Sequence, residues 1–260
     1  MKVKEIYSIL DEEYHFSSAL SWDNVGLLLG DMEKDVKKIV ISLDATSEVI
    51  NKSIDEDCNL LITHHPLLFS PVNKITCDDY IGNRIIKILS NNISYIAMHT
   101  NYDQYGMGKL AAKILGLPNS DVLEITHGEL DEAIGIGEVG DLKETTTLGE
   151  YTEVVKKAFH LPSLTVFGDK NKPVKRVAIS PGSGKSMVDV AVEKGADLLI
   201  TGDIGHHDGL DSIEKELSVI DAGHYGIEKI FMEDVKGYLE TKLQDVKVEI
   251  ISSEAPFHIE

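Results

Sequence analysis

The chain has 260 residues, 42% of them hydrophobic and only 7 of them proline, which suits one large or two small globular domains and excludes an intrinsically disordered protein. Its formal net charge of −19 argues against general nucleic-acid binding, because phosphate binding needs a clustered basic surface. Cys58 and Cys77 form no CxxC pair, so we expect a reduced protein rather than a disulfide scaffold. The first residues lack an apolar signal core, and no stretch approaches the roughly 20 apolar residues of a membrane span. We therefore expect a cytoplasmic protein that does not enter membranes.

Strand-like and helix-like segments alternate along the chain, which is typical of a layered α/β fold with mostly parallel sheets. Apolar periodicity and capping residues define these segments. In chain order we expect helix 2–14, strand 38–44, helix 46–57, strand 60–63, helix 80–90, strand 93–98 and helix 108–115, then, in a second block that begins near residue 124, strands 133–139, 163–167, 176–180, 198–201 and 218–220, helix 226–243 and strand 246–252.

An internal repeat relates the two blocks. Residues 37–63 align without a gap on residues 175–201, with Lys-x-x-x-Ile-Ser at the start and Leu-Leu-Ile-Thr at the end of both. Buried parallel strands are all rich in Val, Ile and Leu, so similar βαβ units also arise without duplication. The matching polar residues at both ends favour a duplication, and a cleft between two duplicated lobes is a natural place for a ligand.

Two adjacent histidines, His64 and His65, directly follow the buried strand 60–63. A strand that ends in this way points both imidazoles at the carboxyl edge of a sheet, where open α/β folds keep their sites. The corresponding positions of the second copy are Gly202 and Asp203, so only the first copy carries this pair.

Three further candidate ligands lie downstream. Asp103 ends the segment that follows the strand 93–98, and His224 and Glu228 are four residues apart. On a helix, positions i and i+4 share a face, so one metal ion could touch both. A lone His-x-x-x-Glu is a weak signal, and a single histidine is more often a surface or hydrogen-bonded core residue. Three ligand sources at strand ends nevertheless favour a metal site.

These five residues predict a dinuclear metal centre of Zn, Fe, Mn, Co or Ni. Successive strand side chains diverge, so His64 and His65 would serve one ion each. Asp103 and Glu228 would bridge the ions, and His224 would complete one of them. Two cations about 3.5–4 Å apart can activate a water as the nucleophile of a hydrolysis. The sequence identifies no independent general base.

Four other residues are candidates to face the substrate or to orient a ligand. Asp203 and His206, beside His207, form a polar cluster after the strand 198–201, although solvated loop histidines are common. Asp23 either caps a turn or contacts the ligand, and the structural role is favoured. His99 is expected to orient Asp103 or a bound phosphate.

Residues 180–186 (SPGSGKS) resemble the end of a phosphate-binding loop. The motif needs a glycine where this chain has Ile179, so the segment is no nucleotide-triphosphatase signature. A tight turn is favoured over a backbone anion site.

The segments 21–27, 62–69, 99–103, 201–204 and 224–228 together resemble the GTP cyclohydrolase I type 2 homologues, the NGG-interacting-factor-three-like dinuclear metal proteins. The resemblance spans nearly the whole chain, and the motifs match in order and spacing. It implies two interleaved α/β lobes with mixed, mostly parallel sheets, two divalent metal ions in the cleft and a ring-shaped homohexamer. Some longer members carry an extra domain between the halves, and we expect this chain to lack it because only residues 125–174 separate residue 124 from the second repeat. We place the first lobe at residues 1–124 plus 222–260 and the second at residues 125–221. The metal ligands that the resemblance implies are His64, His65, Asp103, His224 and Glu228.

Three functions stay open at this stage. The first is a metal-dependent hydrolase of a small molecule, with nucleotide-like compounds among the candidates. The second is a metal-handling or metal-delivery protein that holds the same ions, and the third is a regulatory protein whose metals only brace the lobes. The expected partners are therefore a small-molecule substrate or metal ions, and whether the chain is an enzyme is left open.

Overall fold

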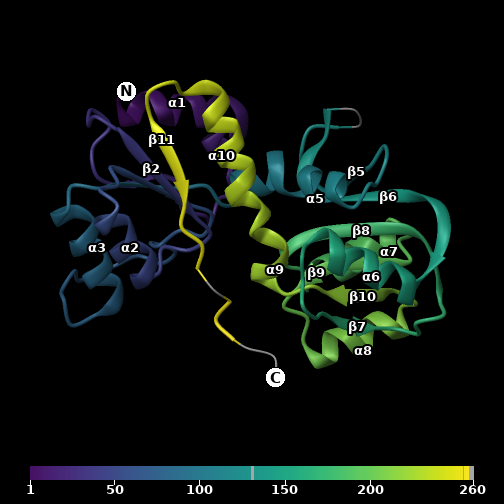
Figure 1. The fold of residues 1–260 in the computed structure, drawn as a ribbon. Helices are drawn as coiled ribbons and strands as arrows, with labels where there is room; N and C mark the ends of the chain where they lie inside the picture. The colour runs from purple at the N-terminus through teal and green to yellow at the C-terminus, as the bar shows by residue number, and fades with distance from the viewer. Residues whose placement is uncertain (130–131, 254, 258–260) are drawn as a thin grey trace. The chain divides into compact units, whose positions relative to one another are not determined.

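The computed structural model describes residues 1–129, 132–253 and 255–257. Within them the chain forms two compact units, residues 1–102 with 231–253 and residues 103–230 with 255–257, and each unit has its own mixed sheet (Figure 1). The predicted α/β class with two sheets is thereby confirmed.

The chain passes between the units after Tyr102 and after Ile230, whereas the sequence analysis placed these divisions near residues 124 and 221. The difference has a packing cause. Ala111 and Ala112 of helix α5 (Gly108–Ile114) and Ile227 of helix α9 (His224–Glu228) are buried in the core of the second unit. The sequence carries no linker composition that would mark either crossing.

The first unit is built on a five-stranded sheet in which three pairings are parallel and one is antiparallel, among the described residues. Its strand order is β1 (Gly26–Leu29), β4 (Ser94–Ala97), β3 (Leu60–Thr63), β2 (Lys38–Ser42) and β11 (Lys247–Ile250). Strand β1 is the antiparallel edge strand, and the sequence analysis missed it because its Gly-Leu-Leu-Leu run is too short to show a period.

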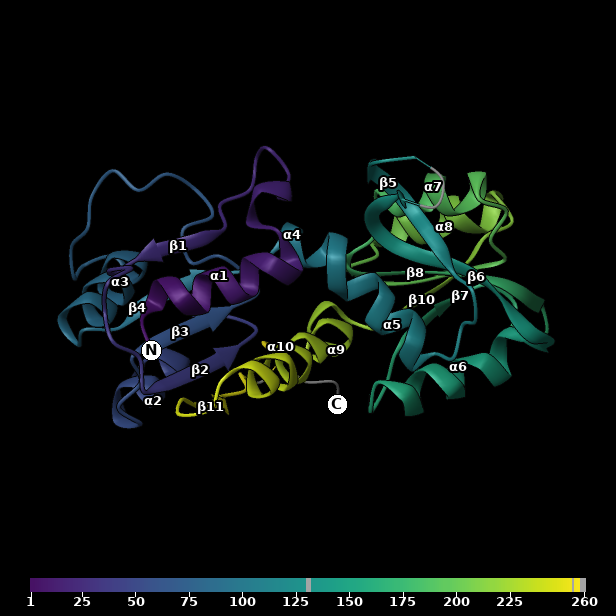
Figure 2. The same cartoon turned by 90° about the horizontal axis from the view of Figure 1, so that it is seen from above.

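Helices cover both faces of this sheet. Helices α2 (Ser47–Asp55) and α3 (Tyr80–Ser90) pack on one face, and helices α1 (Val3–Tyr14) and α10 (Ile230–Lys242) lie together on the other (Figures 1 and 2). The predicted cap of α2 is confirmed, since the Thr46 hydroxyl accepts a hydrogen bond of 3.1 Å from the Val49 amide. The rings of Tyr14 and Tyr238 meet edge to face at 5.5 Å where α1 contacts α10.

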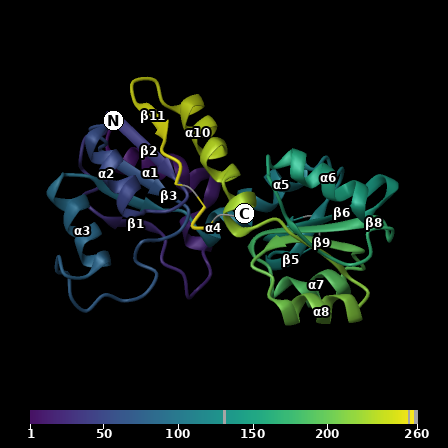
Figure 3. The ribbon, with the colours of Figure 1, turned by 60° about the horizontal axis from the view of Figure 1, so that its bottom comes forward.

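The second unit has a six-stranded sheet with two parallel and three antiparallel pairings, again counted over the described residues. Its strand order is β5 (Asp121–His127), β6 (Ile134–Thr147), β8 (Pro173–Ser183), β9 (Leu198–Gly202), β10 (Ser218–Asp221) and β7 (Thr165–Phe167). Helices α5 and α6 (Leu148–Ala158) lie on one side of it, and α7 (Met187–Glu193) and α8 (His206–Glu214) on the other (Figure 3).

The backbone of the two repeat copies matches in register. Ile39 of β2 pairs with Leu60 of β3, and Val177 of β8 pairs with Leu198 of β9, so partners that correspond in the alignment also correspond in the sheets. The next strand is equivalent as well, because Leu60 pairs with Ser94 of β4 and Leu198 with Ser218 of β10. The common register supports the duplication.

The turn before β3 and β9 is also repeated. The Asn59 side-chain oxygen accepts hydrogen bonds of 2.9 and 3.1 Å from two successive backbone amides at the start of β2. Asp197 occupies the same position in the second copy, and its carboxylate accepts two bonds of 2.8 Å from the equivalent amides of β8. In both copies, therefore, the side chain in the helix-to-strand turn forms the same hydrogen bonds with the backbone of the neighbouring strand.

Two helical segments depart from the predicted elements. The expected helix 226–243 begins earlier, at His224, and is divided into α9 and α10 where the chain leaves the second unit. The short helix α4 (Thr100–Tyr102) continues directly into a π-helical turn, Asp103–Met107, and then into α5. In the described part of the chain, no helix has the length and apolar character to cross a membrane.

Candidate metal centre

Three histidines gather at the carboxyl edge of the first sheet. His64 and His65 follow β3, and His99 follows the neighbouring parallel strand β4. One possible ligand atom from each lies within 4.8 Å of the others. The rings of His64 and His65 have centroids only 4.9 Å apart, because both residues come after the last strand position and no longer diverge as strand side chains do.

Hydrogen bonds fix the tautomers of His64 and His65. Nδ1 of His64 lies 2.7 Å from the Met98 carbonyl oxygen, and Nδ1 of His65 lies 2.8 Å from Oδ1 of Asp44. A carbonyl and a carboxylate only accept, so each Nδ1 carries the proton and each Nε2 presents its lone pair. Histidines that bind metal ions are commonly held in this way by their other ring nitrogen.

Asp44 was not singled out in the sequence. Its position carried a usable signal, because Asp44 follows β2 closely and β2 is the parallel neighbour of the histidine-bearing strand β3. The carboxyl ends of parallel neighbours lie at the same edge of a sheet. An acid beside the His64-His65 pair could therefore have been predicted from the strand order.

Asp23 holds the segment that carries His99. Its buried carboxylate accepts hydrogen bonds from Nδ1 of His99 at 3.0 Å and from the backbone amide and hydroxyl of Thr100 at 3.0 and 2.6 Å. Burial raises the pKa of Asp23, but the bonds from His99 and Thr100 outweigh it and lower this pKa to about 2. Asp23 thus stays ionised and caps the first turn of α4.

The second unit brings His224, Glu228 and Asp203 together. His224 and Glu228 lie one turn apart on α9, with Nε2 and Oε2 at 2.9 Å, as the i, i+4 spacing predicts. Nδ1 of His224 lies 2.7 Å from Oδ2 of Asp203, which follows β9 in a left-handed conformation with φ of 57°. His224 is therefore oriented by a carboxylate in the same way as His65, and its Nε2 points at the carboxylate of Glu228.

Two glycines make room for this pair. Gly182 has φ of +89°, and a Cβ there would lie 2.5 Å from Oε1 of Glu228. A Cβ on Gly202 would lie 2.6 Å from the backbone nitrogen of His224. Residues 180–183 of the glycine-rich segment belong to strand β8, and the predicted turn is confined to residues 185 and 186. Gly182 lies close to α9, which gives this glycine a structural reason.

The remaining predicted residues belong to the second unit. Asp103 is the first residue of the π-helical turn. His206 and His207 are exposed in the first turn of α8, with ring centroids 5.2 Å apart, and neither belongs to a group of possible metal ligands among the described residues. A pocket of about 600 Å³ in the same unit is lined by His224, Asp203 and Lys229 among others.

The donor chemistry fits a divalent metal ion. The groups consist of imidazole nitrogens and carboxylate oxygens, which suit Zn, Fe, Mn, Co and Ni and offer no thiolate. The oriented histidines present the nitrogen that such ions bind. His, Asp and Glu side chains of this chain could therefore hold a metal ion.

The chain and its fold match known proteins. The family model described as Duf34/NIF3 (NGG1p interacting factor 3) matches residues 1–256. A protein of Clostridium acetobutylicum named GTP cyclohydrolase 1 type 2 homolog is 40% identical over 230 residues, covering 88% of this chain and 85% of its own length. A protein of the same name from Clostridium perfringens is 34% identical, covering 98% of this chain and 97% of its own. The crystal structure of a Bacillus cereus protein related to NIF3 superimposes with a TM-score of 0.92 at 26% identity, over 100% of this chain and 99% of that one.

Proposed function

The chain belongs to the Duf34/NIF3 family, and from this premise we propose that it is a metal-dependent hydrolase with a dinuclear centre, acting on a small nucleotide-like molecule. His64, His65, Asp103, His224 and Glu228 are the proposed ligands. The nucleotide class is supported by the names of the relatives, which refer to a GTP cyclohydrolase.

One observation carries the proposal. His64, His65 and His224 each have Nδ1 within hydrogen-bond distance of a carbonyl or carboxylate oxygen, at 2.7, 2.8 and 2.7 Å. An ordinary surface histidine needs no such partner, whereas a metal ligand gains a fixed tautomer and a defined ring orientation. The same arrangement at three candidate ligands is best explained by cation binding.

Chain connectivity supports the participation of Asp103 and Glu228. In the first unit the His64 ring lies 6.1 Å from the Tyr102 ring and 5.2 Å from the Phe231 ring. The Cα atom of Asp103 lies about 3.8 Å from that of its chain neighbour Tyr102. Glu228 precedes Phe231 by three residues, so the Cα atoms of these two residues are at most about 11 Å apart. Both carboxylates are therefore tethered to segments that contact His64.

The proposed roles follow from the side chains. His64, His65 and His224 would each bind through Nε2, while Asp44 and Asp203 hold their rings. The carboxylates of Asp103 and Glu228 would bridge and reduce the repulsion between two cations. A bound cation pair supplies Lewis acidity and activates a water for hydrolysis.

Partial exposure favours metal handling as a second candidate. The side chain of His224 is 33% exposed and that of Asp203 is 56% exposed, so solvent reaches this part of the proposed site. A metal-handling protein must release its ion, and a chelator would then remove at least one ion without unfolding the chain. An ion that only braces the fold would, on removal, lower the melting temperature sharply.

The test is elemental analysis of protein purified without chelators, followed by a hydrolysis screen with nucleotides. We expect two divalent ions per chain, and we expect His65→Ala and Glu228→Gln to lose at least one ion together with any turnover. His206→Ala is the matched control, because His206 is an exposed histidine outside the groups described above. Full metal content in both site variants would contradict the centre, and unchanged turnover in folded variants that have lost an ion would contradict the hydrolase. Assembly into a homohexamer stays a prediction for sedimentation analysis.

A further inference from the structure

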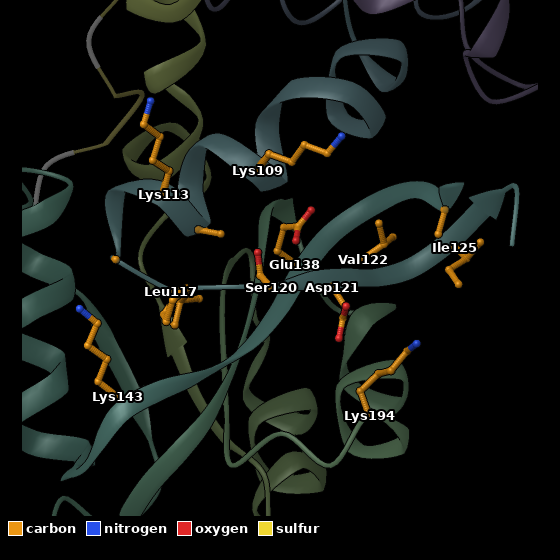
Figure 4. A pocket seen from close by; sticks show the side chains of 14 residues that line it. Lys109, Lys113, Leu117, Ser120, Asp121, Val122, Ile125, Glu138, Lys143 and Lys194 are labelled. Atoms are coloured by element: carbon orange, nitrogen blue, oxygen red, sulfur yellow. The ribbon is translucent and has the colours of Figure 1, made fainter. Parts of the chain in front are cut away.

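A pocket of about 980 Å³ lies in the second unit, between α5, the β5–β6 pair and the end of α7. None of its lining residues is a candidate metal ligand. Figure 4 shows four lysines around it, Lys109, Lys113, Lys143 and Lys194, with Glu138 and Ser120 between them. The volume lies within the usual range of small-molecule sites.

The charge of this pocket opposes that of the whole protein. The lining contains four lysines and only two acids, Asp121 and Glu138, although the chain has a net charge of −19. Among the described residues, none of the four ammonium groups has a carboxylate within 4 Å, whereas Lys185 and Lys215 of the same unit pair with acids at 2.9 and 2.5 Å. An excess of lysines over acids along a pocket favours an anionic ligand over a cationic one.

A stabilising effect on helix ends explains the presence of only two of these four lysines. Lys113 lies in the last turn of α5 and Lys194 caps the end of α7, where a positive charge complements the helix dipole. Lys109 is the second residue of α5, which continues directly from the π-helical turn, and Lys143 lies on strand β6. No helix end accounts for the last two.

Glu138 gives the pocket a second, different recognition group. Its side chain is buried, with only 4% of the residue exposed, and it is hydrogen-bonded to Ser120. Burial raises the pKa of Glu138, while Ser120 and the charge of Lys109 act in the opposite direction. Ser120 uses only part of the accepting capacity of this carboxyl group, because a carboxylate can accept several hydrogen bonds, so a hydroxyl or amino group of a ligand in the pocket could donate another.

We propose that this pocket binds a phosphorylated small molecule, with Lys109 and Lys143 holding its phosphate groups and Glu138 accepting a hydrogen bond from its hydroxyl or amino group. The site needs no metal ion and does not depend on the hydrolase proposal. Its place in the second unit, lined by residues outside the metal ligands, makes it a separate binding site of the chain.

The experiment is calorimetric titration with inorganic tripolyphosphate at low salt, in the presence of a chelator so that bound metal ions take no part. We expect saturable binding at one site, weakened about tenfold or more in the double variant Lys109→Gln with Lys143→Gln. The control is Lys157→Gln with Lys170→Gln, which removes the same charge from two exposed lysines of the same unit outside the pocket, and it should change the affinity less than about twofold. Circular dichroism confirms that both variants fold.

The variant Glu138→Gln tests whether the bound anion lies beside residue 138. Removing a carboxylate beside bound phosphate should tighten tripolyphosphate binding, because the like charge no longer repels it. Absence of saturable binding, equal weakening in the two double variants, or no response to Glu138→Gln would each overturn the proposal. A change of oligomeric state in the pocket variant, without tripolyphosphate binding to the wild type, would also overturn it and would identify a docking face for an acidic surface of a second copy.

Discussion

The two copies of the repeat share their backbone and differ in the residues at the carboxyl ends of their strands. Their strands pair in the same register, and the turns at Asn59 and Asp197 make the same hydrogen bonds. After the shared Leu-Leu-Ile-Thr, the first copy places two histidines and the second places glycine and aspartate. Apolar packing and backbone hydrogen bonding constrain the scaffold, whereas the loops that leave the strands are free to acquire chemistry.

Only the first copy carries two adjacent histidines, but the second copy also has candidate ligands after its strands. In the second unit, Asp203 follows β9 and the His224–Glu228 helix follows β10, the equivalents of β3 and β4. Each unit thus presents candidate ligands at the same edge of its own sheet. A duplicated scaffold can therefore present different side chains at the same edge of each copy.

The largest stability effect is expected at the repeated turn. Asp197→Ala removes the acceptor of two backbone amides and should lower the free energy of unfolding by about 2–3 kcal/mol, since its bonds involve a charged acceptor. Asn59→Ala should cost less, about 1–2 kcal/mol, because its acceptor is neutral. Urea denaturation measures both.

Asn59→Asp is the matched control for these variants. It introduces the residue of the second copy and keeps an oxygen in place for both amides, so we expect little loss of stability. If Asn59→Asp lowered the free energy of unfolding as much as Asn59→Ala, the two turns would not be equivalent, and the two copies would not share their scaffold at this turn.

A smaller effect on stability, with a specific effect on the site, is expected at Gly182. Gly182→Ala would place a methyl group 2.5 Å from Oε1 of Glu228, so it should displace this carboxylate and weaken metal binding. Gly195→Ala is the control, because Gly195 also has a positive φ, +70°, but open space around it. Both should cost about 1 kcal/mol of backbone strain, and only Gly182→Ala should lower the metal content. Equal metal content in the two variants would show that the carboxylate of Glu228 does not bind the ion.

The smallest effect is expected at Cys58, whose counterpart in the second copy is Ala196. Burial raises the pKa of the Cys58 thiol to about 11, so iodoacetamide near neutral pH should modify exposed Cys77 and leave Cys58 intact. Cys58→Ala should change the free energy of unfolding by less than about 1 kcal/mol, because the second copy accommodates alanine at this place. Peptide mass mapping checks the modification, and rapid labelling of Cys58 in the folded protein would contradict its burial.

Much of the scaffold was visible in the sequence because buried parallel strands leave continuous apolar runs. Leu60–Thr63 and Leu198–Gly202 are examples, and the His224–Glu228 spacing was correctly assigned to one helix face. Strand β6 was predicted only to residue 139, because its later residues are polar and are paired with β8 rather than packed in the core.

Other features depend on tertiary contacts that no local pattern records. The Asp44 bond to His65, the Met98 carbonyl at His64 and the Asp23 cap on Thr100 join residues that are distant in the sequence. The division of the chain after Tyr102 is likewise set by where α5 packs, since α5 follows the crossing without a break in the helical backbone. The candidate ligand types, and Asp203 beside them, could therefore be predicted from the sequence, while Asp44 and the Met98 carbonyl are brought to the histidines by the order of the strands in the sheet.

The most direct measurement is a crystal structure of the manganese-loaded protein with anomalous scattering. The account predicts two peaks about 3.5–4 Å apart, with nitrogen ligands from His64, His65 and His224 and carboxylate oxygens from Asp103 and Glu228. Peaks bound by residues of one unit alone, or no peak at these side chains in fully loaded crystals, would contradict it.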